Sequence, residues 1–241
     1  MFILDIKKGL ISKESDGSAA VSLGGTSVMA VVTAMIGSPS NVSPCCGDVE
    51  VCVTLSSVSS ANYDRSKSDE AILLENAVSD IIKGSGIIDL SQLCIVDGEQ
   101  VYVLRINILC LSNAGNLFDA SVLAAAIALS DTKLPSVIIE HNVATVDPSC
   151  PPKPLTLLYI PVPVTVGVFD DHIFIDPSRV EEDIFDGVFS FGFSPDGSVL
   201  HMQHRHKGSG ASTKMLKQVL DHCSIDLQCL RQRTIEALCE K

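Results

Sequence analysis

The chain has 241 residues, of which 46% are hydrophobic and 19% are charged, a composition typical of a globular protein with a sizeable core. Its formal net charge is −12. This excludes a broadly basic nucleic-acid-binding surface, because non-specific affinity comes mostly from Lys and Arg that neutralise phosphates, so we expect any RNA contact to be local or shared with partners.

The first part of the chain predicts strands followed by a helix. Residues 18–32, rich in Val, Ala and Ser, predict a β-hairpin interrupted at Gly24-Gly25. Alternating apolar and polar side chains predict a half-buried strand at 49–55. Apolar side chains recur at helical spacing over 69–82, and Lys83-Gly84 supplies a basic last turn and a glycine stop, so an amphipathic helix is expected there.

The middle of the chain predicts a strand pair and a buried helix. Residues 93–96 and 100–111 flank an Asp97-Gly98 turn, and the near-continuous Val, Leu and Ile of the second strand predict burial on both faces. Residues 118–129 are apolar all round, which predicts a helix packed between layers. The second half repeats this order, with strands expected at 137–141, 155–168, 172–175 and 188–202 and a long helix at 212–238.

The repeated order of strands and helices predicts an α/β (α+β two-layer) fold, with helices over a mixed sheet. No stretch has the composition of a linker. We therefore expect one domain over residues 1–241, with an N-terminal half of about 1–150 and a C-terminal half of about 151–241.

One polar turn, Leu111 to Asn116, lies between the predicted buried strand and the buried helix. Taken alone, such a turn is usually structural. The segments around the turn make the pattern more specific. Asp16-Gly17-Ser18-Ala19 lies upstream, and the segments 164–171 and 175–186 lie downstream. Together these segments resemble the RNase PH-like proteins over nearly the whole chain, and among them most closely the non-catalytic ring subunits of the eukaryotic exosome. The resemblance implies the RNase PH fold, which is related to the ribosomal protein S5 domain 2-like fold.

The resemblance also identifies a vestigial phosphate site. Active family members place Gly-Thr-Arg after the strand, where backbone, hydroxyl and guanidinium hold inorganic phosphate or the RNA end. Here Gly115 is present, but Asn116 and Leu117 stand where Thr and Arg would be. Of the family's two carboxylates, Asp183 would remain and Val188 would stand at the second position. We therefore expect a catalytically silent protein without catalytic residues or a cofactor.

Two groups of basic residues are candidates for RNA binding. Active members carry arginines where the first long helix begins, and this chain offers Arg65 and Lys67, followed by acidic residues. The strongest positive patch contains His204, Arg205 and His206, which could face RNA or a partner. An ordinary exposed strand end is the alternative interpretation of that patch.

Two clusters could be offered as metal sites, but we expect no bound metal. A carboxylate run is more often a solvated loop or helix start, and the histidines lack an apparent fourth ligand. The clusters are Glu181, Glu182, Asp183 and Asp186, and His201, His204 and His206.

The nine cysteines form no C-x-x-C pair and no regular zinc spacing, which predicts reduced, mostly structural thiols. The apolar start gives way at once to Asp5 and Lys7, so no secretory leader and no disulfides are expected. The apolar stretches 120–129 and 155–169 are shorter than the about 20 residues that a membrane helix needs, so no membrane span is expected. Family members usually carry a basic N-terminal segment before the hairpin, and the residues up to Ser15 suggest a shortened start.

The resemblance implies a structural subunit of a hetero-hexameric ring of RNase PH-like domains, capped by S1 and KH domain proteins, through which single-stranded RNA is threaded. It implies a role in 3′-to-5′ processing and degradation of ribosomal and messenger RNA, in the nucleus, nucleolus and cytoplasm. A mean hydropathy of +0.33 fits a protein whose apolar surface is covered by partners.

Two alternatives stay open. One is an active phosphorolytic 3′-to-5′ exoribonuclease or nucleotidyltransferase that uses Asp183 and Asp176 and holds phosphate by backbone N–H groups alone. The other is a stand-alone α/β binding module without a role in RNA metabolism.

Overall fold

The structure is a computed structural model of the whole chain. It describes residues 4–11, 15–40, 42–55, 69–140, 143–147, 149–170, 172–206 and 215–223.

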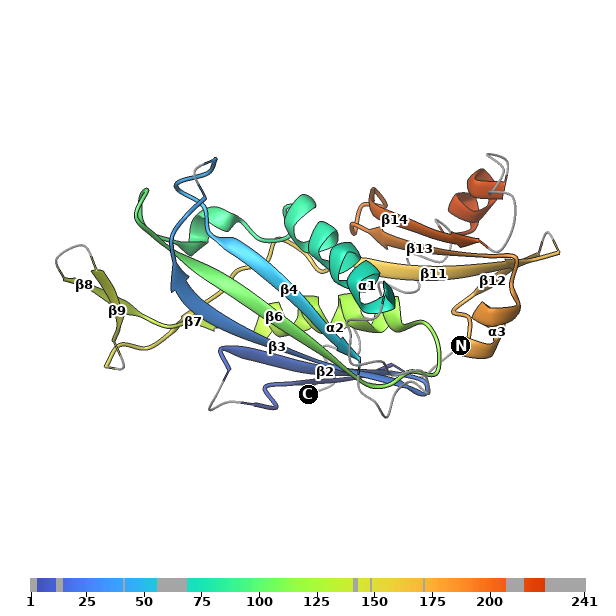
Figure 1. Cartoon of the computed structure of the whole chain (residues 1–241), viewed down its shortest axis with the longest axis horizontal. Helices are drawn as coiled ribbons and strands as arrows, with labels where there is room; N and C mark the ends of the chain where they lie inside the picture. Colours follow the sequence, from blue (N-terminus) through green and yellow to red (C-terminus); the bar gives the residue numbers. More distant parts are fainter. Residues whose placement is uncertain are drawn as a thin grey trace.

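The first sheet contains six strands from the N-terminal half (Figure 1). Neighbouring strands run antiparallel, except that β4 and β6 run parallel. The predicted hairpin is confirmed, since β2 and β3 pair around the turn at Gly24-Gly25. The order across the sheet is β1 (Leu4–Lys8), β2 (Gly17–Leu23), β3 (Thr26–Gly37), β6 (Gln100–Ser112) and β4 (Asp48–Leu55), with β5 (Cys94–Val96) paired to β6.

Two helices pack on one side of this sheet. Helix α2 (Leu117–Asp131) lies against β2 and β3, and every residue of 117–129 is buried, as its all-round apolar sequence predicts. Helix α1 (Asp69–Ser79) packs on β4 and also contacts α2. It ends in a π-helical turn over Asp80–Gly84, so the predicted helix is confirmed with a wider last turn.

The second sheet is formed by the C-terminal half, and α2 also contacts its strand β11. Alternate residues of β13 face opposite sides, so that Phe189, Phe191 and Phe193 join a core with Val219 and Cys223 of the helical segment 215–223. The antiparallel order is β12 (His172–Ile175), β11 (Val162–Phe169), β13 (Gly187–Phe193) and β14 (Val199–His206).

The prediction that the strand at 100–111 is buried on both faces is wrong for the chain by itself. In β6 the side chains of Leu104, Ile106 and Ile108 are buried, whereas Arg105 and Asn107 between them are exposed. Helices α1 and α2 cover only one face of the sheet, so the pleat divides the strand into a core side and an open side.

Other boundaries differ where turn-forming residues interrupt the apolar runs. The strand expected at 155–168 begins only at Val162, directly after Pro161. The strand expected at 188–202 is two strands, β13 and β14, joined through Gly197 at φ +92°. The long helix expected at 212–238 lies outside the described residues except for 215–223, which are helical.

Several short elements were not predicted. Their runs are too short to show a hydrophobic period. They are β1, β7 (Lys133–Leu134), β9 (Val143–Val146, paired with β8, Val137–Glu140), β10 (Lys153–Pro154) and α3 (Arg179–Ile184).

Each of the two sheets has its own cluster of buried apolar side chains. The division of the chain into one domain with two halves stays a prediction. Among the described residues, no helix is both long enough and apolar enough to cross a membrane.

Candidate functional site

Hydrogen bonds hold the polar turn between β6 and α2 against α3 and β3. The N–H of Arg179 donates to the carbonyl of Ala114 at 2.8 Å, and Thr26 Oγ1 donates to the carbonyl of Gly115 at 2.6 Å. Gly115 has φ +118°, and a Cβ there would lie 2.3 Å from the backbone nitrogen of Arg179. Glycine at this position therefore allows the start of α3 to pack directly on the turn.

Asn116 caps helix α2 and is committed to bonds within the protein. It has the left-handed conformation (φ 53°, ψ 44°), which Asn tolerates better than most residues. Its Nδ2 donates to Asp119 Oδ2 at 2.8 Å and to Asp176 Oδ1 at 2.6 Å. The Asn116 side chain thus fixes the start of α2, and the residue is only 2% exposed.

Asp119 joins helix α2 to the second sheet. Its carboxylate accepts hydrogen bonds from the backbone N–H of Thr165 at 3.1 Å and from Thr165 Oγ1 at 2.8 Å. Thr165 Oγ1 also lies 3.1 Å from Ser190 Oγ. Burial raises the pKa of Asp119 to about 7, although the hydrogen bonds from Asn116 and Thr165 act in the opposite direction. We call Asn116, Asp119, Thr165, Asp176 and Ser190 the buried network.

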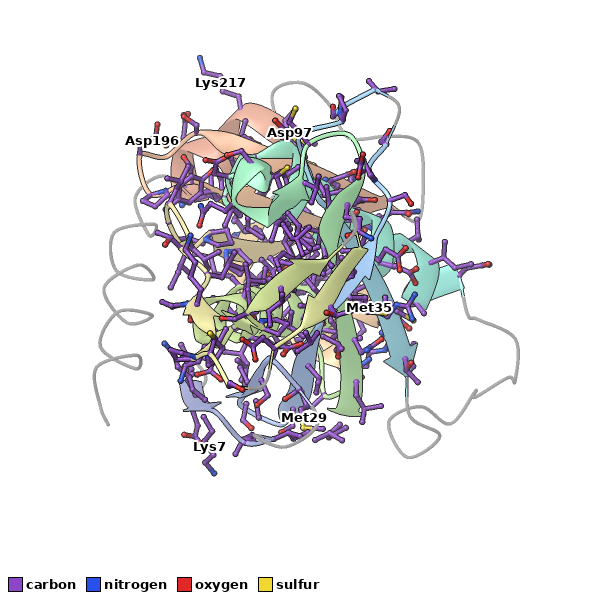
Figure 2. The ribbon with its side chains drawn as sticks, turned by 90° about the vertical axis from the view of Figure 1, so that its left-hand side faces the viewer. Lys7, Met29, Met35, Asp97, Asp196 and Lys217 are labelled. Atoms are coloured by element: carbon purple, nitrogen blue, oxygen red, sulfur yellow. The ribbon has the colours of Figure 1, made fainter. Side chains whose placement is uncertain are left out.

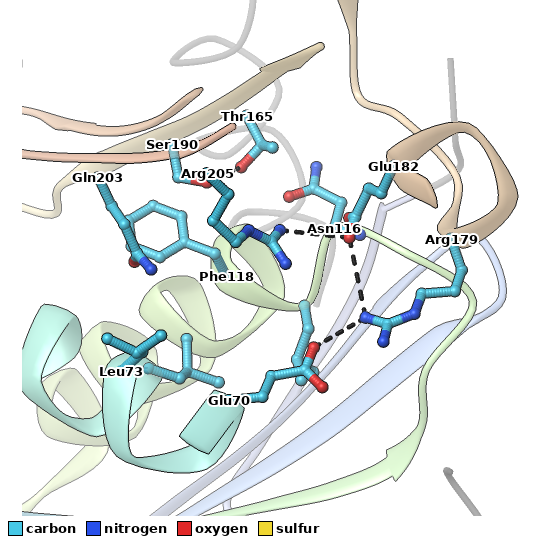
Figure 3. Close-up of a pocket in the computed structure, with 12 residues that line it drawn as sticks. Glu70, Leu73, Asn116, Phe118, Thr165, Arg179, Glu182, Ser190, Gln203 and Arg205 are labelled. Atoms are coloured by element: carbon cyan, nitrogen blue, oxygen red, sulfur yellow. Dashed lines mark hydrogen bonds and ion pairs between the residues drawn. The ribbon is translucent and has the colours of Figure 1, made fainter. Parts of the chain in front are cut away.

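A cavity of about 260 Å³ opens beside this network, between α1, the start of α2, α3 and the second sheet (Figure 3). Leu73, Leu74 and Phe118 give it an apolar wall, and Ser190 and Gln203 add neutral polar groups. Its charged side chains are Glu70, Arg179, Glu182 and Arg205, which we call the charged rim.

The charged rim is a continuous row of alternating charges. Arg179 Nη1 donates to Glu70 Oε1 at 2.8 Å and lies 3.8 Å from Glu182 Oε2. Arg205 Nη2 donates to the same Glu182 oxygen at 3.2 Å. Partial burial lowers the pKa of Arg179, but the hydrogen bond and charge of Glu70 offset this and leave the pKa above its usual value. The cavity thus carries two guanidiniums and two carboxylates.

Of the vestigial phosphate-site residues, Asn116 and Leu117 line this cavity and Gly115 directly precedes them, but all three have other roles. Gly115 packs against α3, and Asn116 belongs to the buried network. Leu117 lines the cavity and is 6% exposed, with its side chain in the first core cluster. None of the three offers a side-chain donor to a phosphate.

The two vestigial acid positions lie differently with respect to the cavity. Val188 is buried, pairs with Arg205 across the second sheet and shares a strand face with Ser190. Asp183 is exposed and is not among the residues that line the cavity, whereas its neighbour Glu182 is buried and does line it. Glu182 is therefore the carboxylate that faces the cavity from α3.

The predicted RNA-binding residues are not gathered on one described surface. Arg65 and Lys67 lie outside the described residues, as does the side chain of His206. His204 stacks on Phe189 with ring centroids 4.2 Å apart, on the face of β14 that carries the second core. Arg205 faces the other way, toward Glu182. The expected patch is thus divided between two faces of one strand.

The carboxylates weighed as a metal site have separate roles. The N–H of Ser178 donates to Glu181 at 2.7 Å, and the N–H of Asp170 donates to Asp186 at 3.1 Å, while Glu182 belongs to the charged rim. His201 packs against Phe118, and burial lowers its pKa. In the described part of the chain, no three His, Cys, Asp or Glu side chains come together as a metal would require.

The ion pairs of the charged rim were not predicted from the sequence, although Arg205 was a candidate for RNA binding and Glu182 was weighed as a metal ligand. Arg179 and Glu70 lie 109 residues apart, and Arg205 and Glu182 lie 23 apart on different elements, so no local pattern joins either pair. Asp119 did carry a local signal, because an acidic residue three positions after an Asn at a helix start is typical of a capped N-terminus.

Comparisons with known proteins identify the family of the chain. Residues 4–135 match domain 1 of the 3′ exoribonuclease family, and residues 159–221 match its domain 2. A protein named exosome complex component Rrp42 from Methanothermobacter thermautotrophicus is 32% identical over 217 residues, covering 90% of this chain and 79% of the relative. The protein of the same name from Thermococcus kodakarensis is 35% identical over 213 residues, covering 88% and 77%.

A solved structure, described as the Archaeoglobus fulgidus exosome with RNA bound to the active site, matches with a TM-score of 0.82 and 29% identity, covering 96% of this chain and 86% of that one. The predicted RNase PH fold, with its mixed sheets and packed helices, is confirmed. The chain belongs to the 3′ exoribonuclease (RNase PH) family.

Proposed function

We propose that this chain is a non-catalytic structural subunit of an RNA exosome core ring, of the Rrp42 type. Relatives of that name cover about nine-tenths of this chain, and the fold is that of an archaeal exosome subunit. In this role the chain supports 3′-to-5′ RNA processing and degradation by helping to build the ring through which RNA passes. Its partners are the other RNase PH-like subunits, with S1 and KH cap proteins on one side.

The main support for the absence of catalysis is the turn after β6, where the side chains are engaged within the protein and do not bind phosphate. Active members of the family need a hydroxyl and a guanidinium there to hold phosphate, and here Asn116 is bonded to Asp119 and Asp176 while Leu117 is in the core. Val188 supplies no second acid. Loss of a single positioned charged or polar group typically lowers the reaction rate by a factor of about 10²–10³. Here the hydroxyl, the guanidinium and the second acid are all missing, which favours a protein without catalytic activity.

The surface supports assembly with partner subunits. Among the described residues, β11, β12 and α3 carry five exposed apolar side chains, of which Val180 is 68% exposed and Ile184 is 59% exposed. The other three are Phe169, Phe174 and Ile175. A group of this kind on a chain that is otherwise strongly acidic suits a protein–protein interface better than RNA binding.

Among eukaryotic ring subunits, we place the chain nearest to ribosomal RNA-processing protein 43. Support comes from Leu93-Cys94-Ile95, from Cys110-Leu111 at the end of β6, and from Lys207-Gly208-Ser209-Gly210, which lies outside the described residues. We assign the protein to the nucleus and nucleolus, and also to the cytoplasm, on the same resemblance.

A tagged pull-down from the native cells at moderate salt, with co-purifying chains counted by mass spectrometry, tests the proposal. We expect five further RNase PH-like chains and the S1 and KH cap proteins in near-equal amounts, and an unrelated protein with the same tag should recover none of them. Recovery of the chain alone would refute the proposal. Release of nucleoside diphosphates from RNA and phosphate by the purified chain would instead support the phosphorolytic alternative.

A further inference from the structure

Glu182 occupies an unusual place for a carboxylate. Its side chain is only 6% exposed, and its Oε1 accepts the backbone N–H of Asn116 at 2.7 Å. That N–H belongs to the cap of α2, a helix of 15 residues whose first turn carries unpaired N–H groups and partial positive charge. A negative charge is therefore favoured at the position that Glu182 fills.

The same carboxylate is held by cations from two other elements. Arg205 of β14 donates to Oε2 at 3.2 Å, and Arg179 of α3 lies 3.8 Å from that atom (Figure 3). A backbone N–H and two guanidiniums around one oxyanion are the groups that bind a phosphate or sulfate in proteins. The protein has thus assembled an oxyanion site inside the cavity and filled it with its own side chain.

We propose that Glu182 determines what this cavity accepts, because its carboxylate takes the place of an external oxyanion and repels any second one. Without that carboxylate, the Asn116 N–H, Arg179 and Arg205 bind inorganic phosphate. The inference rests on the proposed silence of the cavity and gives it a second cause besides the missing hydroxyl and guanidinium, but it does not depend on membership of a ring.

The test measures inorganic phosphate binding to the full-length chain by isothermal titration calorimetry at constant ionic strength, with chloride as the replaced anion. Glu182→Ala opens the site, and Glu182→Gln removes the charge that holds this side chain against the two guanidiniums, so that phosphate can displace it. Asp183→Ala is the matched control, because it makes the same charge change on the exposed neighbouring residue. Circular dichroism checks that each variant is folded.

We expect both Glu182 variants to bind phosphate at least about tenfold more tightly than the wild type and the Asp183→Ala variant, which corresponds to about 1.4 kcal/mol. Adding Arg205→Gln to Glu182→Gln should remove most of the gain. If Glu182→Ala does not fold, the comparison of Glu182→Gln with Asp183→Ala decides. Equal phosphate affinity of the wild type and a folded Glu182 variant would overturn the inference.

The phosphate-binding test of Glu182 and the pull-down test of ring membership can fail independently of each other. A chain that recruits ring subunits but gains no phosphate binding in the Glu182 variants refutes the role of Glu182 alone. A chain that recruits no partners but gains phosphate binding keeps the role of Glu182 and refutes the ring.

Discussion

Two polar regions meet at the start of α2, and they are built differently. The buried network is mostly shielded from solvent, with Asp119 7% exposed, Asn116 2% exposed and Asp176 half-buried, and it links α2 to the second sheet. The charged rim lies beside it at the cavity, where the side chains of Arg179 and Arg205 are 40% and 44% exposed. Both regions contain carboxylates, but only the rim neutralises them with guanidiniums.

This difference predicts that the buried network mainly affects the stability of the fold, whereas the charged rim mainly affects what the cavity binds. Removing one partner of a buried hydrogen bond lowers the free energy of unfolding by about 1–3 kcal/mol, because the remaining donor or acceptor cannot bond to water instead. Exposed ion pairs contribute about 0–1 kcal/mol. We therefore expect changes in the buried network to destabilise the fold, and changes at the exposed rim residues Glu70, Arg179 and Arg205 to have little effect on stability.

The largest expected effect is the pH dependence caused by Asp119. The pKa of Asp119 is about 7 in the folded protein, against an ordinary value of 3.8, so between these values the folded chain binds a proton that the unfolded chain lacks. The contribution of Asp119 to the free energy of unfolding is therefore fully present below pH 3.8 and falls by up to about 1.4 kcal/mol per pH unit as the pH rises toward 7. Urea unfolding of the wild type across this range measures the slope.

Asp119→Asn is the variant that isolates this effect. An amide can accept from Asn116 and the Thr165 N–H, and can donate to Thr165 Oγ1, which then donates to Ser190, so it mimics the protonated acid. The variant should lose the part of the slope that Asp119 contributes, whereas Asp183→Asn, at an exposed position, should keep it. The same slope in the Asp119→Asn variant and the wild type would contradict the assignment.

The next effect concerns Gly115, which connects the two regions. A Cβ at position 115 would lie 2.3 Å from the backbone nitrogen of Arg179 and 2.5 Å from the backbone carbon of Ser178, so α3 must move. Gly115→Ala should lower the free energy of unfolding by about 3 kcal/mol, the upper end of what local backbone strain costs. Chemical unfolding at pH 7 measures it.

Gly86→Ala is the control for this substitution. Gly86 also has a positive φ, +68°, but a Cβ there meets nothing within 4 Å. Gly86→Ala should lower the free energy of unfolding by about 1 kcal/mol, from the cost of the backbone conformation alone. Equal losses at the two glycines would mean that the contact between the turn and α3 contributes nothing.

The fold could be predicted further than the site because its signals are local. The all-apolar run 118–129 predicts a buried helix whatever surrounds it, and the structure buries the whole run. Burial of β6 on both faces could not be judged in this way, since Arg105 and Asn107 show their exposure only once the position of the covering helices is known.

The site depends on pairings that no local pattern encodes. The resemblance to a known family predicted a site at Gly115, Asn116 and Leu117, and in the structure Asn116 and Leu117 line the cavity whereas Gly115 packs against α3. Which of Glu182 and Asp183 faces the cavity could be decided only from the orientation of α3, because adjacent side chains of a helix point about 100° apart. The pairing of Glu182 with Arg205 required the register of β14.

The smallest expected effect is at the outer end of the charged rim. Glu70 Oε1 accepts from Arg179 at 2.8 Å, but the Glu70 side chain is 34% exposed and that of Arg179 is 40% exposed. Glu70→Gln should therefore lower the free energy of unfolding by less than about 1 kcal/mol, and by less still in high salt. Thermal unfolding at low and high ionic strength measures both values.

Glu50→Gln is the matched control, because Glu50 and Arg105 form a pair at 2.9 Å between β4 and β6, with side chains 50% and 47% exposed. The two substitutions should cost similar, small amounts, since both pairs compete with water. A loss of about 3 kcal/mol at Glu70 alone would place it with the buried network and remove the distinction between the two regions. A small loss keeps that distinction, because the inner carboxylate Glu182 then remains the only rim acid shielded from solvent among the described residues.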